Sequence, residues 1–172
     1  MIEVLILYVI QKREKTMYAI RKEIFDVFGS FTKPSIGTIY PALKRLQKMG
    51  AIALTERMSE GGKKSSYYSI TEKGVKDFRD LFFDTTSDNP SLFYPQLLTR
   101  ICVMDYLSLE DRKLFIQESV KKIEMLQFDI DKKLNDEFLN LSYFHKEVLR
   151  TTKKSLTSLS AFIKQIKVEN DG

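Results

Sequence analysis

The chain has 172 residues, of which 43% are hydrophobic, 30% charged and 12% aromatic, a composition that indicates a globular protein of one domain or two small ones. Its single cysteine, Cys102, excludes a disulfide-stapled secreted domain and a cysteine-cluster zinc site, so we expect a cytoplasmic protein. The 28 Lys and Arg residues against 23 Asp and Glu leave a net charge of +5, which favours an anionic partner.

The first run of the chain, Ile2 to Ile10, is apolar except for Glu3. It is shorter than the ~20 residues of a membrane span and lacks the basic start of a signal peptide, so we expect a buried helix and no membrane association. A helix that is apolar nearly all round must be covered on most of its circumference. We therefore expect part of this helix, including Leu5 and Tyr8, to lie against a second chain.

Two further helices follow. After a charged connection, Lys12–Lys15, Thr16 is placed to cap a helix that Gly29 ends. Its apolar residues at roughly helical spacing are Tyr18, Ile20, Ile24, Val27 and Phe28. Pro34 and Ser35 open the next helix, which Gly50 ends and in which Pro41 is expected to kink or tighten the first turns. Its apolar face consists of Ile39, Leu43, Leu46 and, less clearly placed, Ile36.

A β-hairpin and a fourth helix complete the first half. Two extended runs, Ala51–Met58 and Ser65–Ile70, flank the polar Gly-Gly turn Ser59–Lys64. Thr71 then caps a helix over Glu72–Phe83, and the polar break Thr85–Pro90 predicts a domain boundary. We therefore expect one domain over residues 1–84 and a second over 85–172.

The second half reads as helices throughout. Pro90 to about Leu107 forms one segment, and Ser108 with Asp111 resembles a capping box that starts a long helix. Narrow apolar seams predict a coiled-coil-like pair of long helices, within one chain or between two copies. The seam positions are Ile116, Val120, Ile123, Gln127, Ile130, Leu134 and Leu141 in one helix, and Leu149, Thr152, Leu156, Leu159, Ile163 and Ile166 in the last.

The charge excess lies in one part of the chain. Residues 1–84 contain 15 basic and 10 acidic residues, whereas residues 85–172 contain 13 of each. Between residues 33 and 64, seven basic residues face only Glu56 and Glu60. Three helices, a hairpin and a helix with this charge distribution are the plan of a winged helix, in which the third helix enters the DNA major groove.

The same residues resemble a known family. The segments Pro34–Leu46, Gly61–Lys64 and Tyr67–Gly74 look like the PadR family of bacterial transcriptional regulators. The chain departs from the family pattern at Met17–Ile20, where members usually carry Gly-Tyr-Glu-Ile. The resemblance implies a dimeric winged-helix repressor with a C-terminal helical dimerisation region and, in many members, a small-molecule effector.

The expected site residues follow from the resemblance and the charge pattern together. Ser35, Thr38 and Tyr40 match the family's DNA-facing motif, with helix capping for Ser35 and burial for Tyr40 as the alternatives. The full DNA-binding set is Lys33, Ser35, Thr38, Tyr40, Lys44, Arg45, Lys63, Lys64 and Tyr67. The dimerisation set is Leu5, Tyr8, Ile123, Ile130, Leu149, Leu156, Leu159, Ile163 and Ile166.

Enzymatic functions have little support in the sequence. His145 is the only histidine, and it falls at a seam position, four residues before Leu149, that favours a packed or interfacial side chain. Because there is no phosphate-binding glycine loop and no His or Cys pair at metal-ligand spacing, we expect neither an enzyme nor a bound metal or cofactor.

The overall prediction is a mainly α protein with a small β-hairpin, in which a winged helix-turn-helix domain precedes an all-helical, coiled-coil-like dimerisation domain. We expect a cytoplasmic homodimeric regulator of transcription, a repressor that binds a pseudo-palindromic operator in double-stranded DNA and is released by a small-molecule effector. Phe93, Tyr94, Tyr106 and Phe144 are candidates for an effector pocket, with packed core as the alternative. The other interpretations are an activator of the same fold and a protein-interaction module that uses the helical half.

Overall fold

A computed structural model describes residues 1–58, 62, 64–84 and 90–169. The chain divides into two compact units, Met1–Tyr106 and Leu107–Gly172. Lys63, one of the expected DNA-binding residues, lies outside the described residues.

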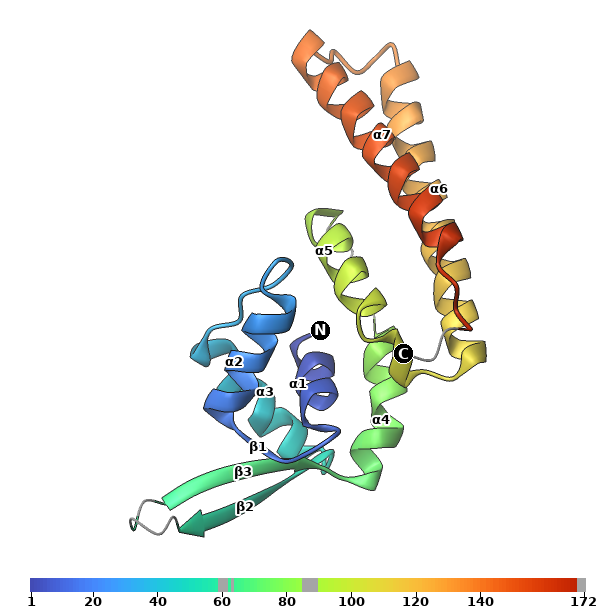
Figure 1. Cartoon of the computed structure of the whole chain (residues 1–172). Helices are drawn as coiled ribbons and strands as arrows, with labels where there is room; N and C mark the ends of the chain where they lie inside the picture. The colour runs from blue at the N-terminus through green and yellow to red at the C-terminus, as the bar shows by residue number, and fades with distance from the viewer. Residues whose placement is uncertain (59–61, 63, 85–89, 170–172) are drawn as a thin grey trace. The chain divides into compact units, whose positions relative to one another are not determined.

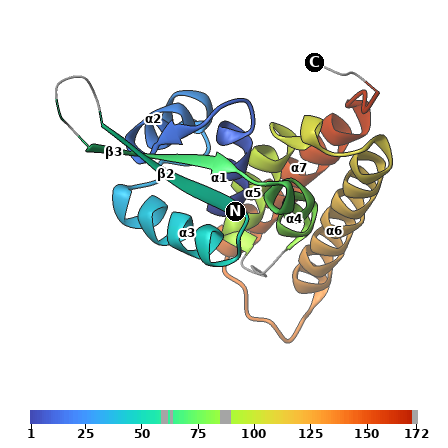
Figure 2. The ribbon, with the colours of Figure 1, turned by 90° about the horizontal axis from the view of Figure 1, so that it is seen from below.

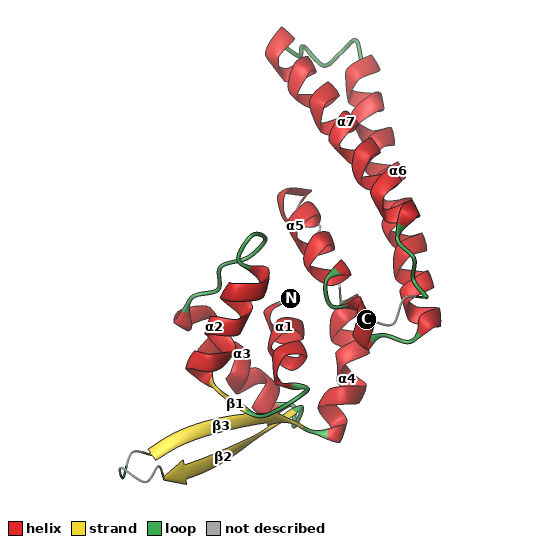
Figure 3. Ribbon diagram, in the orientation of Figure 1, coloured by secondary structure: helices red, strands yellow, loops and turns green. Residues whose placement is uncertain are grey.

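The first unit is a winged helix. In chain order it contains α1 (Ile2–Ile10), β1 (Lys15–Thr16), α2 (Met17–Phe28), α3 (Ile36–Lys48), β2 (Ile52–Met58), β3 (Lys64–Ile70), α4 (Glu72–Phe83), α5 (Pro90–Ile101) and the 3₁₀ turn η1 (Met104–Tyr106). Helices make up most of this unit and its small sheet lies at one edge (Figure 3), which confirms the expected mainly α fold class.

Polar caps set the starts of three of these helices. The Oγ1 atom of Thr16 accepts a hydrogen bond from the amide of Ala19 (3.3 Å), and that of Thr71 accepts one from the amide of Gly74 (3.0 Å). Ser35 caps α3 in the same way. Each bond satisfies an amide that has no partner inside the helix, which is why these helix starts are predictable from the sequence.

The sheet has three antiparallel strands in the order β1-β3-β2. The hairpin pairs Ile52 with Ile70 and Met58 with Lys64, and it projects away from the helices (Figures 1 and 2). The third strand, β1, is not predicted by the sequence, in which Lys15 reads as the end of a charged connection and Thr16 as a helix cap. They form a strand because they pair with Tyr68 and Tyr67 of β3, far along the chain.

The apolar helix α1 is the centre of the first unit. It packs against α2, α3 and α4, and Val4, Ile6 and Leu7 are completely buried. The expectation that α1 needs a second chain to cover it is corrected, because the helices of its own unit enclose it. Leu5 is 1% exposed, and the ring of half-buried Tyr8 packs edge-on against Phe28 and Tyr106 of the same unit.

The first unit continues past the expected boundary after residue 84. Arg100 of α5 is buried and donates from Nε to the carbonyl oxygen of Phe82 (2.8 Å) and from Nη2 to that of Asp84 (3.0 Å). The ring of Tyr106 lies 4.8 Å from that of Tyr8. These contacts join α5 and η1 to the winged helix, so residues 90–106 belong to it by packing. A functional division into DNA-binding and dimerising parts stays a prediction.

The second unit is a helical hairpin of α6 (Leu109–Asn135) and α7 (Tyr143–Gln165), which run side by side (Figures 1 and 2). Ser108 caps α6 as predicted, accepting from the amide of Asp111 at 3.1 Å. The half-buried side-chain amide of Gln127, the polar interruption of the seam, donates to Thr157 Oγ1 (2.8 Å). The buried apolar residues between the helices are Phe115, Ile123, Ile130, Leu156, Leu159 and Ile163.

The seam helices therefore pair within one chain. Of the expected dimerisation residues, Ile123, Ile130, Leu156, Leu159 and Ile163 are buried in this hairpin, and Leu149 and Ile166 are half-buried. The buried face starts at Phe115 and Ser119, one position before the expected Ile116 and Val120, while Thr152 is exposed. Leu141 lies outside the helices because α6 ends at Asn135.

His145 is exposed in the first turn of α7, not packed in the seam. Its backbone amide donates to Ser142 Oγ at 3.3 Å, and its Nδ1 lies 3.1 Å from the same oxygen. The interpretation as a packed histidine is therefore wrong, because the ring takes part in the N-terminal cap instead. The alternative of an interfacial histidine stays a prediction.

The close approach of α4 to the segment after α3 generates a stability prediction. A Cβ atom added at Gly74 would lie 2.0 Å from the carbonyl oxygen of Ala51, whereas one added at Gly37 would meet only Ser35 Oγ at 3.5 Å. Gly74→Ala should lower the free energy of unfolding by about 3 kcal/mol, while Gly37→Ala should be neutral or stabilising by up to about 1 kcal/mol. Urea titrations measure both, and equal effects of the two changes would contradict the packing described.

Candidate nucleic-acid interface

Helix α3 presents one buried and one exposed face. Ile39, Ala42, Leu43 and Leu46 are buried, and they point into the first unit because they recur every three or four residues. The opposite face exposes the expected contact residues Thr38, Tyr40, Lys44, Arg45 and Lys48, and Ser35 and Lys33 are exposed just before the helix. The side chain of Tyr40 is 49% exposed, which rules out the alternative that it is a core residue.

Ser35 has a structural role at the start of this face. Its Oγ accepts from the amide of Thr38 at 3.2 Å and lies 3.0 Å from the hydroxyl of Thr38. The alternative that Ser35 caps the helix is therefore present in the structure. Because a hydroxyl has one proton and two lone pairs, capping still leaves Ser35 the capacity for one further hydrogen bond.

A groove of about 390 Å³ lies between α3, the start of α2 and the hairpin. It is lined by Thr16, Met17, Tyr18, Tyr40, Lys64, Ser65, Ser66 and Tyr68. These lining residues supply hydroxyls and one ammonium group and include no carboxylate, a set of donors that suits phosphate oxygens. Burial, with the neighbouring Tyr40 adding to it, raises the pKa of the Tyr68 phenol, so this hydroxyl stays a donor at neutral pH.

Six of the groove residues were not among the expected contacts: Thr16, Met17, Tyr18, Ser65, Ser66 and Tyr68. Tyr18 was counted with the apolar face of α2, but it is 67% exposed, while Ile20, Ile24 and Phe28 are buried. The strict spacing of four between those three residues places Tyr18 off their face, and that is the sequence signal that identifies it. The serines carry no comparable signal, because hairpin serines are common on solvated strands.

The basic residues of this surface are partly paired. Arg45 is bonded to Glu3 (Nε–Oε1, 2.9 Å), Arg57 forms an ion pair with Glu14, and Lys64 lies 2.5 Å from Glu56. Glu3 and Glu14 come from outside the range of residues 33–64, so folding brings two more carboxylates against its seven basic residues. The excess of five charges in the sequence is therefore nearer three in the folded surface.

The structure does not bring Tyr67 together with Tyr40. Tyr67 lies on the other face of the sheet, half-buried with the Arg57 guanidinium 5.3 Å from the centre of its ring. It lines a separate groove of about 530 Å³ together with residues of the α1–α2 connection and of α2, namely Arg13, Glu14, Lys15, Thr16, Ala19, Lys22, Glu23 and Asp26. The charges there are largely paired with one another, as in Lys15–Glu23 (2.7 Å) and Lys22–Asp26 (2.6 Å).

Two negative findings concern other kinds of site. Among the described residues, no group of three His, Cys, Asp or Glu side chains is placed to hold a metal ion. None of the described helices combines the length and apolar character that crossing a bilayer requires.

Comparison with known proteins identifies a family to which the first unit is similar. Residues 6–80 match the model of the transcriptional regulator PadR-like family. No functionally curated protein has a significant match to the chain.

Several solved structures are similar to the chain. A PadR-like transcriptional regulator from Bacillus cereus is 37% identical over 45% of this chain and 74% of its own, with a TM-score of 0.40. A PadR family transcription regulator from Clostridium difficile is 30% identical over 46% and 80%, with a TM-score of 0.39. Bacillus subtilis PadR in complex with operator DNA is 18% identical over 94% and 93%, with a TM-score of 0.43.

The cap of α3 can be tested by stability alone. Ser35→Ala removes the acceptor of the Thr38 amide and should lower the free energy of unfolding by about 1 kcal/mol, whereas Ser35→Asp should retain it. Chemical denaturation followed by circular dichroism measures both variants. A Ser35→Ala protein as stable as the wild type would show that the hydroxyl does not cap the helix.

Proposed function

The chain belongs to the PadR-like family of transcriptional regulators, and we propose that it is a homodimeric repressor that binds the two halves of a pseudo-palindromic DNA operator. Regulators of this family bind DNA and are not enzymes. The observation that carries the proposal is the exposed face of α3, which bears hydroxyls and lysines and adjoins a groove whose lining residues include no carboxylate.

The proposed contacts divide by chemistry. Lys33, Lys44, Lys48 and Lys64 are exposed and suit phosphates, which provide affinity but little sequence information. Lys64 keeps this capacity because its pair with Glu56 is solvent-exposed on both sides, at 63% and 50%, and exposed pairs are weak. Thr38 and Tyr40, on the exposed face of α3, are placed to meet base edges or phosphates when the helix enters the major groove.

A dimer is the second part of the proposal. Two recognition helices reach successive major grooves when they lie about one helical turn apart, ~34 Å. The seam residues are buried within the α6–α7 hairpin, so we assign the contact between copies to apolar side chains that stay exposed on that hairpin. Large ones are Met125, Phe128, Phe144 and Val148, each more than half exposed. Apolar exposure on this scale is typical of interaction surfaces.

The aromatic residues expected to line an effector pocket differ in burial. Tyr106 packs against Tyr8 and Phe78 in the core of the first unit. Phe93 is half-buried, whereas Tyr94 and Phe144 are about half exposed or more. Three of the four aromatic residues belong to the first unit and Phe144 belongs to the second. We propose that the protein acts in the cytoplasm and represses transcription by occupying the operator, and we name no effector.

The hairpin lysines provide a direct test of DNA binding. Lys63→Ala combined with Lys64→Ala should weaken binding to operator and random DNA alike, and it should reduce the slope of log affinity against log salt by about one unit per lost contact. Fluorescence anisotropy at several salt concentrations measures the slope. The matched control is Lys132→Ala with Lys133→Ala, the same charge change in the charge-neutral helical half. An unchanged slope for the hairpin variant would remove the hairpin from the interface.

The dimer is tested by mass. Sedimentation at micromolar concentration should give twice the 20.1 kDa of one chain, and Phe128→Ser combined with Val148→Ser should shift the protein toward one chain. Val75→Ser, an exposed apolar change in the first unit (51% exposed), is the control and should leave the mass unchanged. A wild-type mass of a single chain would contradict the proposed dimer.

A further inference from the structure

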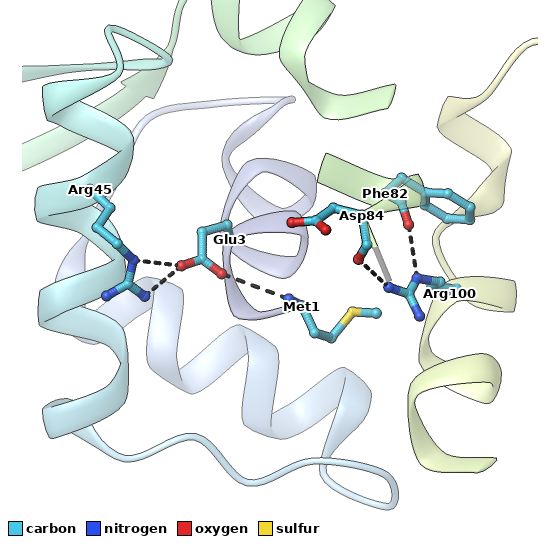
Figure 4. Close-up of polar contacts among 6 residues, drawn as sticks. All are labelled: Met1, Glu3, Arg45, Phe82, Asp84 and Arg100. Carbon is cyan, nitrogen blue, oxygen red and sulfur yellow. Dashed lines mark hydrogen bonds and ion pairs between the residues drawn. The ribbon is translucent and has the colours of Figure 1, made fainter. Parts of the chain in front are cut away.

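Arg45, on the exposed face of α3, is held by a residue 42 positions earlier in the chain. Its Nε and Nη2 atoms donate to Oε1 of Glu3, at 2.9 and 2.5 Å (Figure 4). Two donors on one edge of the guanidinium thus meet a single carboxylate oxygen. The arrangement ties α3 to the first turn of α1.

The Glu3 carboxylate is largely enclosed, at 17% exposure, whereas Arg45 is 57% exposed. A carboxylate removed from water must be paired to remain charged. Burial by itself raises the pKa of Glu3, but the hydrogen bonds from Arg45 and the backbone outweigh it, so the pKa lies below its ordinary value. Oε2 of Glu3 lies 3.7 Å from the N-terminal ammonium group, which adds a second positive charge on the other side (Figure 4).

The two ends of this ion pair differ in how their helices are held. Glu3 directly precedes Val4 to Leu7, the most deeply buried run of the chain, so its backbone is fixed by packing on several sides. Helix α3 rests on α1 through aliphatic side chains. Because apolar contact is non-directional, this contact limits the separation of the two helices more than the rotation of α3 about its axis. An arginine–carboxylate pair is directional and adds the missing restraint.

Rotation of α3 matters for its exposed face. Side chains extend about 5 Å from a helix axis, so a rotation of about 10° displaces their ends by about 1 Å. Hydrogen bonds to base edges tolerate only a few tenths of an ångström. Contacts to phosphates by long lysines tolerate much more, because the side chain can follow the charge.

From this geometry we infer that Arg45 is a positioning residue: the Glu3–Arg45 ion pair fixes the rotation of the recognition helix against α1, and thereby sets the preference for operator over random DNA. The inference rests on the proposed function. It replaces the expectation that Arg45 itself contacts a phosphate, and it gives Glu3, a residue of the core helix, a part in specificity.

The variant Glu3→Gln tests the inference because the two possible roles of Arg45 predict opposite changes in operator affinity. The change keeps shape but removes the charge that holds Arg45. We expect operator affinity to fall roughly tenfold, as for loss of one charge-assisted hydrogen bond, while affinity for random DNA stays within about twofold. If Arg45 were instead a phosphate contact, Glu3→Gln would tighten binding to both DNAs, because it frees a cation and removes an anion from the surface.

The variant Arg45→Gln provides an independent measurement. It should lower operator affinity as much as Glu3→Gln does and leave the salt slope unchanged, and the double variant should be no worse than either single one. Lys44→Gln, one residue earlier, is the matched control and should reduce the slope by about one unit. A slope reduced to the same extent by Arg45→Gln would overturn the inference.

The assay uses the full-length protein and the sequence that the wild type selects from randomised DNA, with thermal melting to confirm that each variant is folded. Glu147→Gln, which breaks the Glu147–Arg150 pair of α7, should change neither affinity.

If the Glu3 variant does not fold, Arg45→Gln decides the matter, since its side chain is mostly exposed. A wild type that selects no DNA would overturn the proposed function and this inference with it. Operator binding that is insensitive to both variants would overturn the inference alone.

Discussion

The burial of α1 is the constraint on which the first unit depends. A nine-residue helix without a polar face beyond Glu3 has to be enclosed, and α2, α3 and α4 pack around it to do so. Helix α3 therefore has one face committed to the core and the other to solvent. Because the apolar residues of α3 face the core, the polar residues that remain exposed to solvent are those of the proposed interface, namely Thr38, Tyr40, Lys44 and Lys48.

Electrostatics refine this arrangement. In the sequence the basic residues between 33 and 64 form a nearly uncompensated run, but the folded chain places Glu3 and Glu14 against two of them. The arginines of this surface are tied to carboxylates of the protein itself, whereas Lys33, Lys44 and Lys48 are exposed, with the Lys44 ammonium 5.6 Å from the centre of the Tyr40 ring. This division suits the two side chains, since guanidinium groups form directional pairs and ammonium groups act as adaptable point charges.

Local signals account for what the sequence predicts well. Thr16, Ser35 and Ser108 act as caps through bonds to amides three residues away, so their helices begin where expected. The two-residue strand β1 and the Glu3–Arg45 pair depend on partners more than forty positions distant, and no local pattern reports them. The heptad pattern identified the buried Ile123, Ile130, Leu156, Leu159 and Ile163 but misplaced the start of the seam. Periodicity also cannot say whether a seam faces its own chain or a second one. The extent of the first unit was not predicted either. It depends on the buried Arg100, and because arginine is rarely fully buried, its position in the sequence does not indicate that it packs there.

The central claim is that α3 and the hairpin form a phosphate-binding surface. The most direct measurement is titration of the wild-type protein with double-stranded DNA at 50 and 200 mM salt. About four lysine–phosphate contacts predict a loss of affinity of roughly a hundredfold between the two concentrations. Binding of equal strength at both concentrations, or no binding at either, would contradict the account.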